Sequence, residues 1–382
     1  MDAALFAIWY VLVPGLAAFA VGHAGRTWSS RLGWAARGVD WAGLSVVGAA
    51  FAAYVVTLHR AEDGLAAVLA PPGVVCLFQA CGSLLRRSEW LIWIPGVALG
   101  AWLATQNGVV IDSVKPPFTE QFVRTGPWAA LVTIGWALLV VTAFGSASHV
   151  RGAPLAIGAV VAAGMLVVCL LQPQVTGRAA QQVAAVLAAG CLGALLATRR
   201  APEAAGSSGF LAVGFSVALL SVMGALKNTA FLIVVLPLML IGVPLLDATY
   251  AVLYRRRRGE TALAIESEPQ RLHDILASAR FSDTQILWLY VLGSVYLTLL
   301  AVFLVALIRV HFSVKLLILA VALPAGAALL WIIGKSTRRV SGAPTDGREM
   351  VAAWNVRLTG VTMEGAIATI DEFIRSKRPH HV

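Results

Sequence analysis

The stretch LMLIGVPLLDATYAVLYRRRR occupies residues 238–258. It ends an apolar run long enough to cross a bilayer, and this run carries one carboxylate, Asp247, close to Pro244. An ionisable side chain in a membrane helix is costly unless it faces other helices or water, so Asp247 is expected to mark a functional site. The four arginines that follow predict that this end of the helix lies in the cytoplasm.

The rest of the chain is similarly apolar. Its 382 residues are 59% hydrophobic and only 13% charged, whereas a soluble domain of this size would carry more charge. Basic residues gather at one end of each apolar run and account for the net charge of +10, so nucleic-acid binding is not expected. The composition therefore indicates an integral membrane protein.

Apolar runs of membrane-spanning length recur about eleven times in residues 1–334. They predict an all-α transmembrane bundle with spans near 3–22, 41–58, 64–85, 90–107, 127–145, 153–172, 180–198, 209–226, 230–254, 285–308 and 314–334. Arginine and lysine concentrate in alternate loops, those that follow the odd-numbered spans. This alternation predicts an N-terminus outside the cell and a C-terminus in the cytoplasm.

Two cytoplasmic segments carry further candidate site residues. Residues 201–211 place Glu203 and Ser207 at the start of the eighth span, where small residues can bring backbone N–H groups towards a phosphate. Residues 259–284 are too polar to span a membrane and contain His273, with a short helix expected over 269–279. In the outside loop after the fourth span, Asp112 is expected to be a solvated charge.

The C-terminal part of the chain is polar and differs from the bundle. Residues 335–350 are interpreted as a linker, and residues 351–382 as a short strand followed by an amphipathic helix with Thr362 as its N-cap. One strand and one helix cannot enclose a hydrophobic core. We therefore expect this short α/β fragment to be the incomplete start of a larger cytoplasmic domain.

Residues 201–215 and 230–281 together resemble the second half of the bacterial polyprenyl-phosphate N-acetylhexosamine-1-phosphate transferases. The shared features are the Pro-apolar-apolar-Asp pattern with its arginine-rich exit in Gly242–Gly259, the Gly-Ser helix start, and the loop that bears a histidine. These multi-pass proteins of the bacterial inner membrane transfer a sugar phosphate from a UDP-sugar to undecaprenyl phosphate, using Mg²⁺ at the cytoplasmic face.

This resemblance implies a role for each candidate residue. Asp247 and His273 would be catalytic, and Asp247 and Glu203 would bind Mg²⁺. The residues that would bind the sugar nucleotide or the polyprenyl phosphate are Ser207, Arg255, Arg256 and Arg271. A purely structural alternative for Asp247 is an ion pair with Arg255 or Arg256 near the membrane interface.

The family's other acidic motifs are missing where the resemblance places them. Its Asp-Asp pair after the third span is replaced by Arg86 and Arg87, and its Asp-rich run after the fifth span by residues 142–154, which contain no carboxylate. Loss of one electrostatic stabiliser commonly costs ~10²–10³ in rate. The sequence therefore predicts weak or absent transferase activity, with Mg²⁺ as cofactor only if the chain is active. The arginines either bind a phosphate without metal or act only as topology determinants.

The tail carries a second resemblance. Residues 355–370 are similar to the first strand and helix of the cytoplasmic N-acetylmannosaminyltransferase family, which adds the next sugar to a polyprenyl-diphospho-sugar. An alternative function is therefore a non-catalytic membrane scaffold that anchors a cytoplasmic glycosyltransferase. A lipid or small-molecule transporter is a third possibility, but the sequence shows no internal repeat and no paired broken helices around mid-membrane charges.

Overall fold

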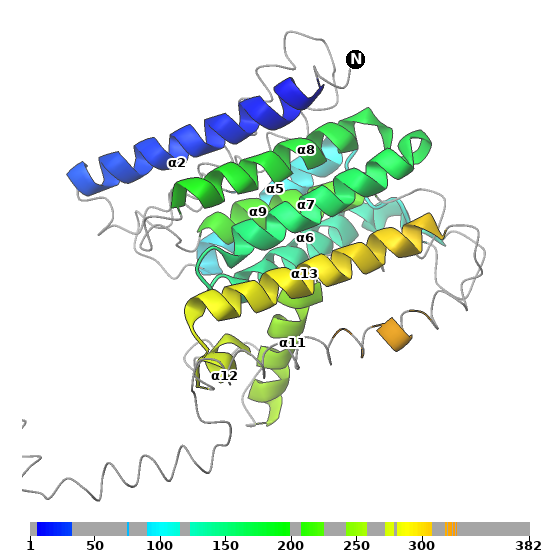
Figure 1. Cartoon of the computed structure of the whole chain (residues 1–382). Helices are drawn as coiled ribbons and strands as arrows, with labels where there is room; N and C mark the ends of the chain where they lie inside the picture. Colours follow the sequence, from blue (N-terminus) through cyan, green and yellow to red (C-terminus); the bar gives the residue numbers. More distant parts are fainter. Residues whose placement is uncertain are drawn as a thin grey trace, which may run out of the picture. The chain divides into compact units, whose positions relative to one another are not determined.

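A computed structural model of the chain describes residues 6–32, 75, 90–114, 123–198, 208–224, 242–257, 272–278 and 281–307, with six positions between 318 and 326 (Figure 1). These residues belong to one compact unit, Met1–Ala327. The second unit, Ala328–Val382, lies outside the described residues, and so do the linker, the Thr362 N-cap and the resemblance of the tail. Those interpretations stay predictions.

The described part of the chain is mostly helical, as the apolar runs predict. Its helices are η1 (Ile8–Leu12), α2 (Val13–Leu32), α5 (Trp90–Gln106), η3 (Gly126–Trp128), α6 (Ala129–Ala147), α7 (Ala153–Leu171), α8 (Pro173–Thr198), α9 (Ser208–Gly224), α11 (Gly242–Arg257), α12 (Leu272–Ser278) and α13 (Asp283–Ala306). The helix α12 lies within the range 269–279 where a short helix is predicted.

Four described segments are long and apolar enough to cross a membrane: Gly126–Ala147, Ala153–Leu171, Gly177–Ala197 and Asp283–Ala306. Two shorter apolar segments are Ile8–Val21 and Phe210–Met223. Each of these six segments falls on a predicted span. The predicted spans 41–58, 64–85 and 314–334 lie almost wholly outside the described residues, so the count of eleven and the orientation of the termini stay predictions.

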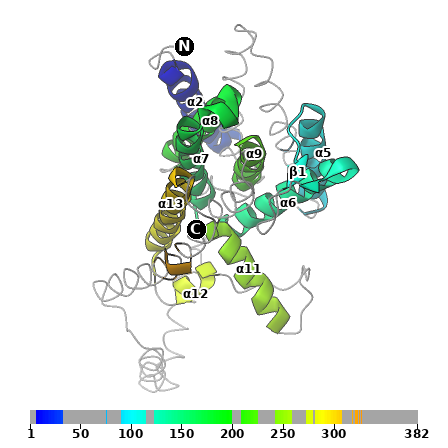
Figure 2. The ribbon, with the colours of Figure 1, turned by 90° about the vertical axis from the view of Figure 1, so that its right-hand side faces the viewer.

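The helices form two rows when the bundle is viewed along their axes (Figure 2). One row runs α2, α8, α7, α13, and each helix contacts the next. The other runs α9, α6, α5, and α9 also contacts α7 and α8. About two thirds of the residues in the most apolar parts of α7 and α8 are buried, compared with 39% in the apolar segment Gly126–Ala147, which includes α6. The helices α7 and α8 therefore lie at the centre of the bundle.

Glycines allow the central helices to approach one another closely. A Cβ atom at Gly158 of α7 would overlap Val213 of α9, and one at Gly193 of α8 would overlap the backbone carbonyl of Gly15 in α2. Small residues at such crossings let helix backbones come into contact, which favours helix association in a bilayer. The sequence spacing alone does not show which glycines meet which helices.

A buried hydrogen bond joins the start of the chain to α8. The π-helix Ile8–Leu12 ends two residues before Pro14, whose ring cannot accommodate the carbonyl of residue i−4 in a regular α-helix. The π-helix contains Tyr10, whose hydroxyl accepts a hydrogen bond from Gln182 Nε2 at 3.1 Å. Both side chains are buried, at 1% and 2% exposure, so α8 places this polar pair inside the bundle.

A β-hairpin with two residues in each strand follows α5 and is tied to α6. Its strands, β1 (Ser113–Val114) and β2 (Val123–Arg124), pair antiparallel. Thr125 Oγ1 donates to the Ile111 carbonyl, and the Ile111 N–H donates to Thr133 of α6. Asp112 is exposed beside this hairpin, which confirms that it is a surface charge.

Two helices depart from the predicted boundaries. The helix α2 runs to Leu32, ten residues past the predicted end of the first span, and its more polar second half contains no proline that would end it. The helix α8 begins at Pro173, seven residues before its predicted span, and contains one non-helical residue, Gly177, at φ 72° and ψ 165°. Hydropathy locates the part of a helix that crosses lipid, and it does not locate the ends of the helix itself.

Candidate functional site

The helix α11 presents Asp247 to the bundle. Pro244 and Asp247 are buried on one face, while Leu246, Thr249 and Val252 are exposed on another. Asp247 has no exposed surface at all, at 0%. This burial is expected of an ionisable group in a membrane helix, whereas the role of Asp247 in a functional site stays a prediction.

A hydrogen bond fixes the start of α11 against the end of α6. Ser146 Oγ lies 2.9 Å from the Pro244 carbonyl oxygen and 2.8 Å from the Ala143 carbonyl oxygen, so its one proton is shared between the two acceptors. Ser146 is buried, at 8% exposure. This contact brings together the two stretches that the sequence singles out, residues 142–154 and the helix that carries Asp247.

The turn between α6 and α7 comes directly after Ser146 in the chain. Its backbone is reversed by Gly152, which has φ 77° and is the N-cap of α7. Val150 is buried under the turn, while His149 and Arg151 are exposed. The turn therefore offers an imidazole and a guanidinium to solvent, and no acid.

His273 lies on a helix that packs beside Asp247's helix. The short helix α12 contacts both α11 and α13 (Figure 1). His273 Nδ1 is 3.3 Å from Asp274 Oδ1, and the two side chains are 23% and 50% exposed. The neighbouring carboxylate can orient the imidazole, and the exposure of the pair leaves the ring accessible to a ligand.

The structure does not describe the side chains of the other predicted site residues. Glu203, Ser207 and Arg271 lie outside the described residues. Arg255 and Arg256 belong to the last turn of α11, but their side chains are likewise outside the described part of the chain. Their proposed contacts with metal or substrate, and the ion pair with Asp247, stay predictions.

The described acids do not make up a magnesium site by themselves. Mg²⁺ in phosphoryl-transfer sites is held by one or two carboxylates together with phosphate and water oxygens. Asp247 supplies one carboxylate, but the α6–α7 turn supplies Arg151 and His149 instead of a second one. Among the residues that the structure describes, no three His, Cys, Asp or Glu side chains come together as a metal site.

Sequence reasoning missed Ser146. A serine three residues after a helix carbonyl commonly bonds back to that carbonyl, as Ser148 and Ser221 do here, so the residue type alone does not mark a contact with another helix. The available signal was position: Ser146 lies in the stretch where the family has its Asp-rich run.

The apolar helices indicate a membrane protein, and its buried aspartate lies on a helix whose start is hydrogen-bonded to the end of α6. The chain is similar to a probable undecaprenyl-phosphate N-acetylglucosaminyl 1-phosphate transferase of Bacillus subtilis (strain 168), at 24% identity over 219 residues. The match covers 56% of this chain and 58% of the relative. No protein-family model matches the chain. This distant similarity supports the resemblance to sugar-1-phosphate transferases. It does not test the resemblance of residues 355–370 to a cytoplasmic glycosyltransferase.

Proposed function

We propose that this chain has the fold of the polyprenyl-phosphate sugar-1-phosphate transferases and acts in the assembly of lipid-linked sugars at the cytoplasmic face of a bacterial inner membrane, with weak or lost transferase activity. Its substrates would be a polyprenyl phosphate and, if the chain is active, a UDP-sugar with Mg²⁺. The Bacillus relative supports the family. The apolar helices support the membrane location.

The observation that carries the proposal is the junction of α6 and α11. Asp247 is fully buried on the face of α11 that the Ser146–Pro244 hydrogen bond holds against α6. This is the buried carboxylate that the resemblance implies, and it contrasts with the acid-free stretch 142–154 beside it. Catalysis of phosphoryl transfer depends on several charges that stabilise the transition state together, so the loss of the family's acidic motifs from residues 142–154 and from the place of Arg86 and Arg87 favours a low rate.

The arginines predicted to lie on the side of this junction favour binding of a phosphate group. Arg151 is exposed in the α6–α7 turn, and Arg86, Arg87, Arg199 and Arg200 belong to loops predicted to lie on the same side of the membrane. Guanidinium groups bind phosphate oxygens in pairs without a metal. We therefore expect the chain to bind polyprenyl phosphate or the pyrophosphate of a sugar nucleotide even where turnover is lost.

The second candidate function is a non-catalytic scaffold that anchors a cytoplasmic glycosyltransferase. The missing acidic motifs and the resemblance of residues 355–370 to a cytoplasmic glycosyltransferase favour it. The two candidates share a fold and a membrane location. They differ in whether Asp247 supports chemistry.

An assay of UMP release distinguishes them. Purified full-length chain is incubated with Mg²⁺, UDP-N-acetylglucosamine and undecaprenyl phosphate, and the Bacillus relative is assayed in parallel. We expect UMP release at least ~10²-fold below that of the relative, because several charged groups are lost. Robust release that is abolished in Asp247→Asn but retained in Asp112→Asn, a change at an exposed carboxylate, would show an active enzyme and exclude the scaffold.

Lipid extracted from the purified chain tests the shared part of the proposal. Undecaprenyl phosphate identified by mass spectrometry in the purified wild-type chain, and depleted in Arg151→Ala, is the expected result. Its absence from both, under conditions in which the Bacillus relative retains it, would contradict a role with polyprenyl phosphate.

A further inference from the structure

Two exposed tryptophans lie at the end of the bundle that carries the β-hairpin. Trp102 is four residues before the end of α5 and is 47% exposed, and Trp128 directly precedes α6 and is 66% exposed. The hydrogen bond from the Ile111 N–H to Thr133 holds the segment after α5 against the first turns of α6, so both rings belong to the same end of the bundle. Leu131 of α6 adds exposed apolar surface there.

An indole as exposed as that of Trp128 is best accommodated at a membrane interface. Water leaves its large apolar ring unburied, whereas the hydrocarbon core of a bilayer offers no acceptor for its N–H group. Trp136 illustrates the second point: it is about 12 Å further along α6, and it donates its indole N–H to Ser221 of α9. The headgroup region suits both parts of an exposed indole, and tryptophan is enriched there.

The length of α6 agrees with an interface at Trp128. The 19 residues of this helix rise about 28 Å, close to the roughly 30 Å thickness of the hydrocarbon core of a bilayer. The chain becomes polar again where α6 ends, because the α6–α7 turn exposes His149 and Arg151. A bilayer boundary at Trp128 therefore places this polar turn at the opposite boundary.

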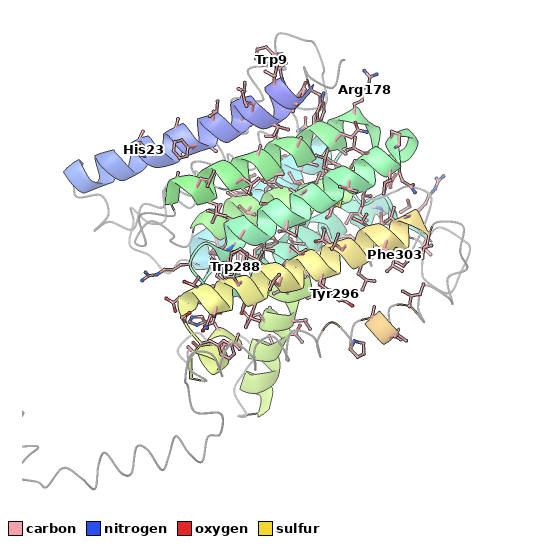
Figure 3. The ribbon with its side chains drawn as sticks, viewed as in Figure 1. Trp9, His23, Arg178, Trp288, Tyr296 and Phe303 are labelled. Atoms are coloured by element: carbon pink, nitrogen blue, oxygen red, sulfur yellow. The ribbon has the colours of Figure 1, made fainter. Side chains whose placement is uncertain are left out.

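Trp288 repeats the pattern on that opposite side. It lies five residues after Asp283, the first residue of α13, and is 59% exposed. From Trp288 to Ala306, the last residue of α13, the helix rises about 27 Å, which again matches the hydrocarbon core. Figure 3 shows Trp288 near the α12 end of the bundle and the exposed Arg178 at the other end. Exposed indoles therefore mark both ends of the apolar helices.

We propose that Trp102 and Trp128 on one side, and Trp288 on the other, lie in the headgroup regions of the two leaflets and fix the position of the bundle along the membrane normal. Their partner is the lipid itself: glycerol-ester and phosphate oxygens accept hydrogen bonds from the indole N–H groups, and the adjacent parts of the acyl chains pack on the rings. By the predicted orientation, Trp102 and Trp128 contact the outer leaflet. The inference rests on the proposed membrane location and is independent of transferase activity.

Fluorine NMR of the full-length chain, labelled with fluorotryptophan and held in lipid bicelles, tests this placement. The peak of each ring is identified by its absence from the corresponding variant, Trp128→Phe or Trp288→Phe. Phosphatidylcholine is then added that carries a nitroxide either at the headgroup or at the middle of an acyl chain, because a nitroxide broadens the signals of nearby fluorine atoms. We expect the headgroup nitroxide to broaden both peaks several-fold more than the acyl-chain nitroxide does.

Leu139→Trp is the matched control, because Leu139 is exposed and lies about 16 Å beyond Trp128 along α6, in the middle of the expected span. Its added peak should respond more to the acyl-chain nitroxide. Where this control responds, stronger broadening of the Trp128 or Trp288 peak by the acyl-chain nitroxide, or no broadening by either lipid, would overturn the anchoring. A control peak that responds to neither lipid would overturn the membrane location and the inference with it. If Trp128→Phe does not fold, Trp102→Phe identifies the neighbouring ring on the same side.

Discussion

The indole N–H of Trp136 in α6 donates a hydrogen bond to Ser221 Oγ in α9, at 2.8 Å. Ser221 is 4% exposed, and its hydroxyl donates a hydrogen bond to the Ala218 carbonyl, 2.7 Å away. The two residues are 85 positions apart in the sequence, so this bond ties the centre of the second row of helices together.

Replacing Trp136 by phenylalanine should destabilise the bundle modestly. Hydrogen bonds between membrane helices contribute about 0.6 kcal/mol on average, with a maximum near 1.7 kcal/mol. We expect a loss in this range in unfolding by a denaturing detergent. Trp128→Phe, at a residue that is 66% exposed, should leave stability unchanged. Equal losses for both variants would show that ring size and not the hydrogen bond is responsible.

Gly193→Ala should separate α2 from α8. A Cβ atom at Gly193 would overlap the Gly15 carbonyl oxygen and lie 3.1 Å from the Cβ atom of Ala18, and backbone cannot give way as a side chain can. Overpacking of this kind costs about 1–3 kcal/mol. Gly135→Ala in α6 meets nothing within 4 Å and should be neutral or stabilising, by up to about 1 kcal/mol. Melting temperatures of the two variants measure the contrast.

Ser146→Ala should loosen the start of α11. The variant loses the hydrogen bond to the Pro244 carbonyl, which we expect to cost about 0.5–1.5 kcal/mol. Ser148→Ala is the matched control, because the Ser148 hydroxyl bonds the Gly145 carbonyl of its own helix. Limited proteolysis after the arginines of α11 should accelerate only in Ser146→Ala. Identical cleavage of the two variants would contradict a role for Ser146 in holding α11.

Ser282→Ala should weaken the start of α13. Ser282 accepts from the Gln285 N–H, and Gln285 Oε1 accepts from the Ser282 N–H, which together form a capping box. Removing an N-cap serine typically costs about 0.5–2 kcal/mol. Hydrogen exchange of the first turn of α13 should become faster, while Thr284→Ala, an exposed change in the same turn, should have a smaller effect. Unchanged exchange in Ser282→Ala would show that tertiary contacts alone hold this helix end.

Much of the bundle is predictable because the physical signals are local. Long apolar runs predict where α6, α7, α8 and α13 lie, since a membrane-spanning helix needs about 20 apolar residues. The burial of Asp247 is predictable for the same reason, because a carboxylate facing lipid would be too costly. Polarity also located α12 as a separate short helix.

Contacts between helices are not predictable from this sequence alone. Serine at position 146 is compatible with an ordinary bond to its own helix, and only the structure shows that its proton also reaches Pro244. The glycine at position 193 equally gives no sign that its partner is Gly15, because a close helix approach depends on two surfaces that are far apart in the chain. The roles of Glu203, Ser207 and Arg271 stay predictions, since these residues lie outside the described part.

The hydrogen bond between Tyr10 and Gln182 sets an order for biosynthesis. The two partners are separated by 172 residues, so a ribosome adding about 5–20 residues per second needs roughly 10–30 s between them. For that interval the N-terminal helix must wait in the membrane or at its insertion site without this contact. A variant that lacks Gln182 would never form this bond, and more of its newly made chains should be removed by quality-control proteases.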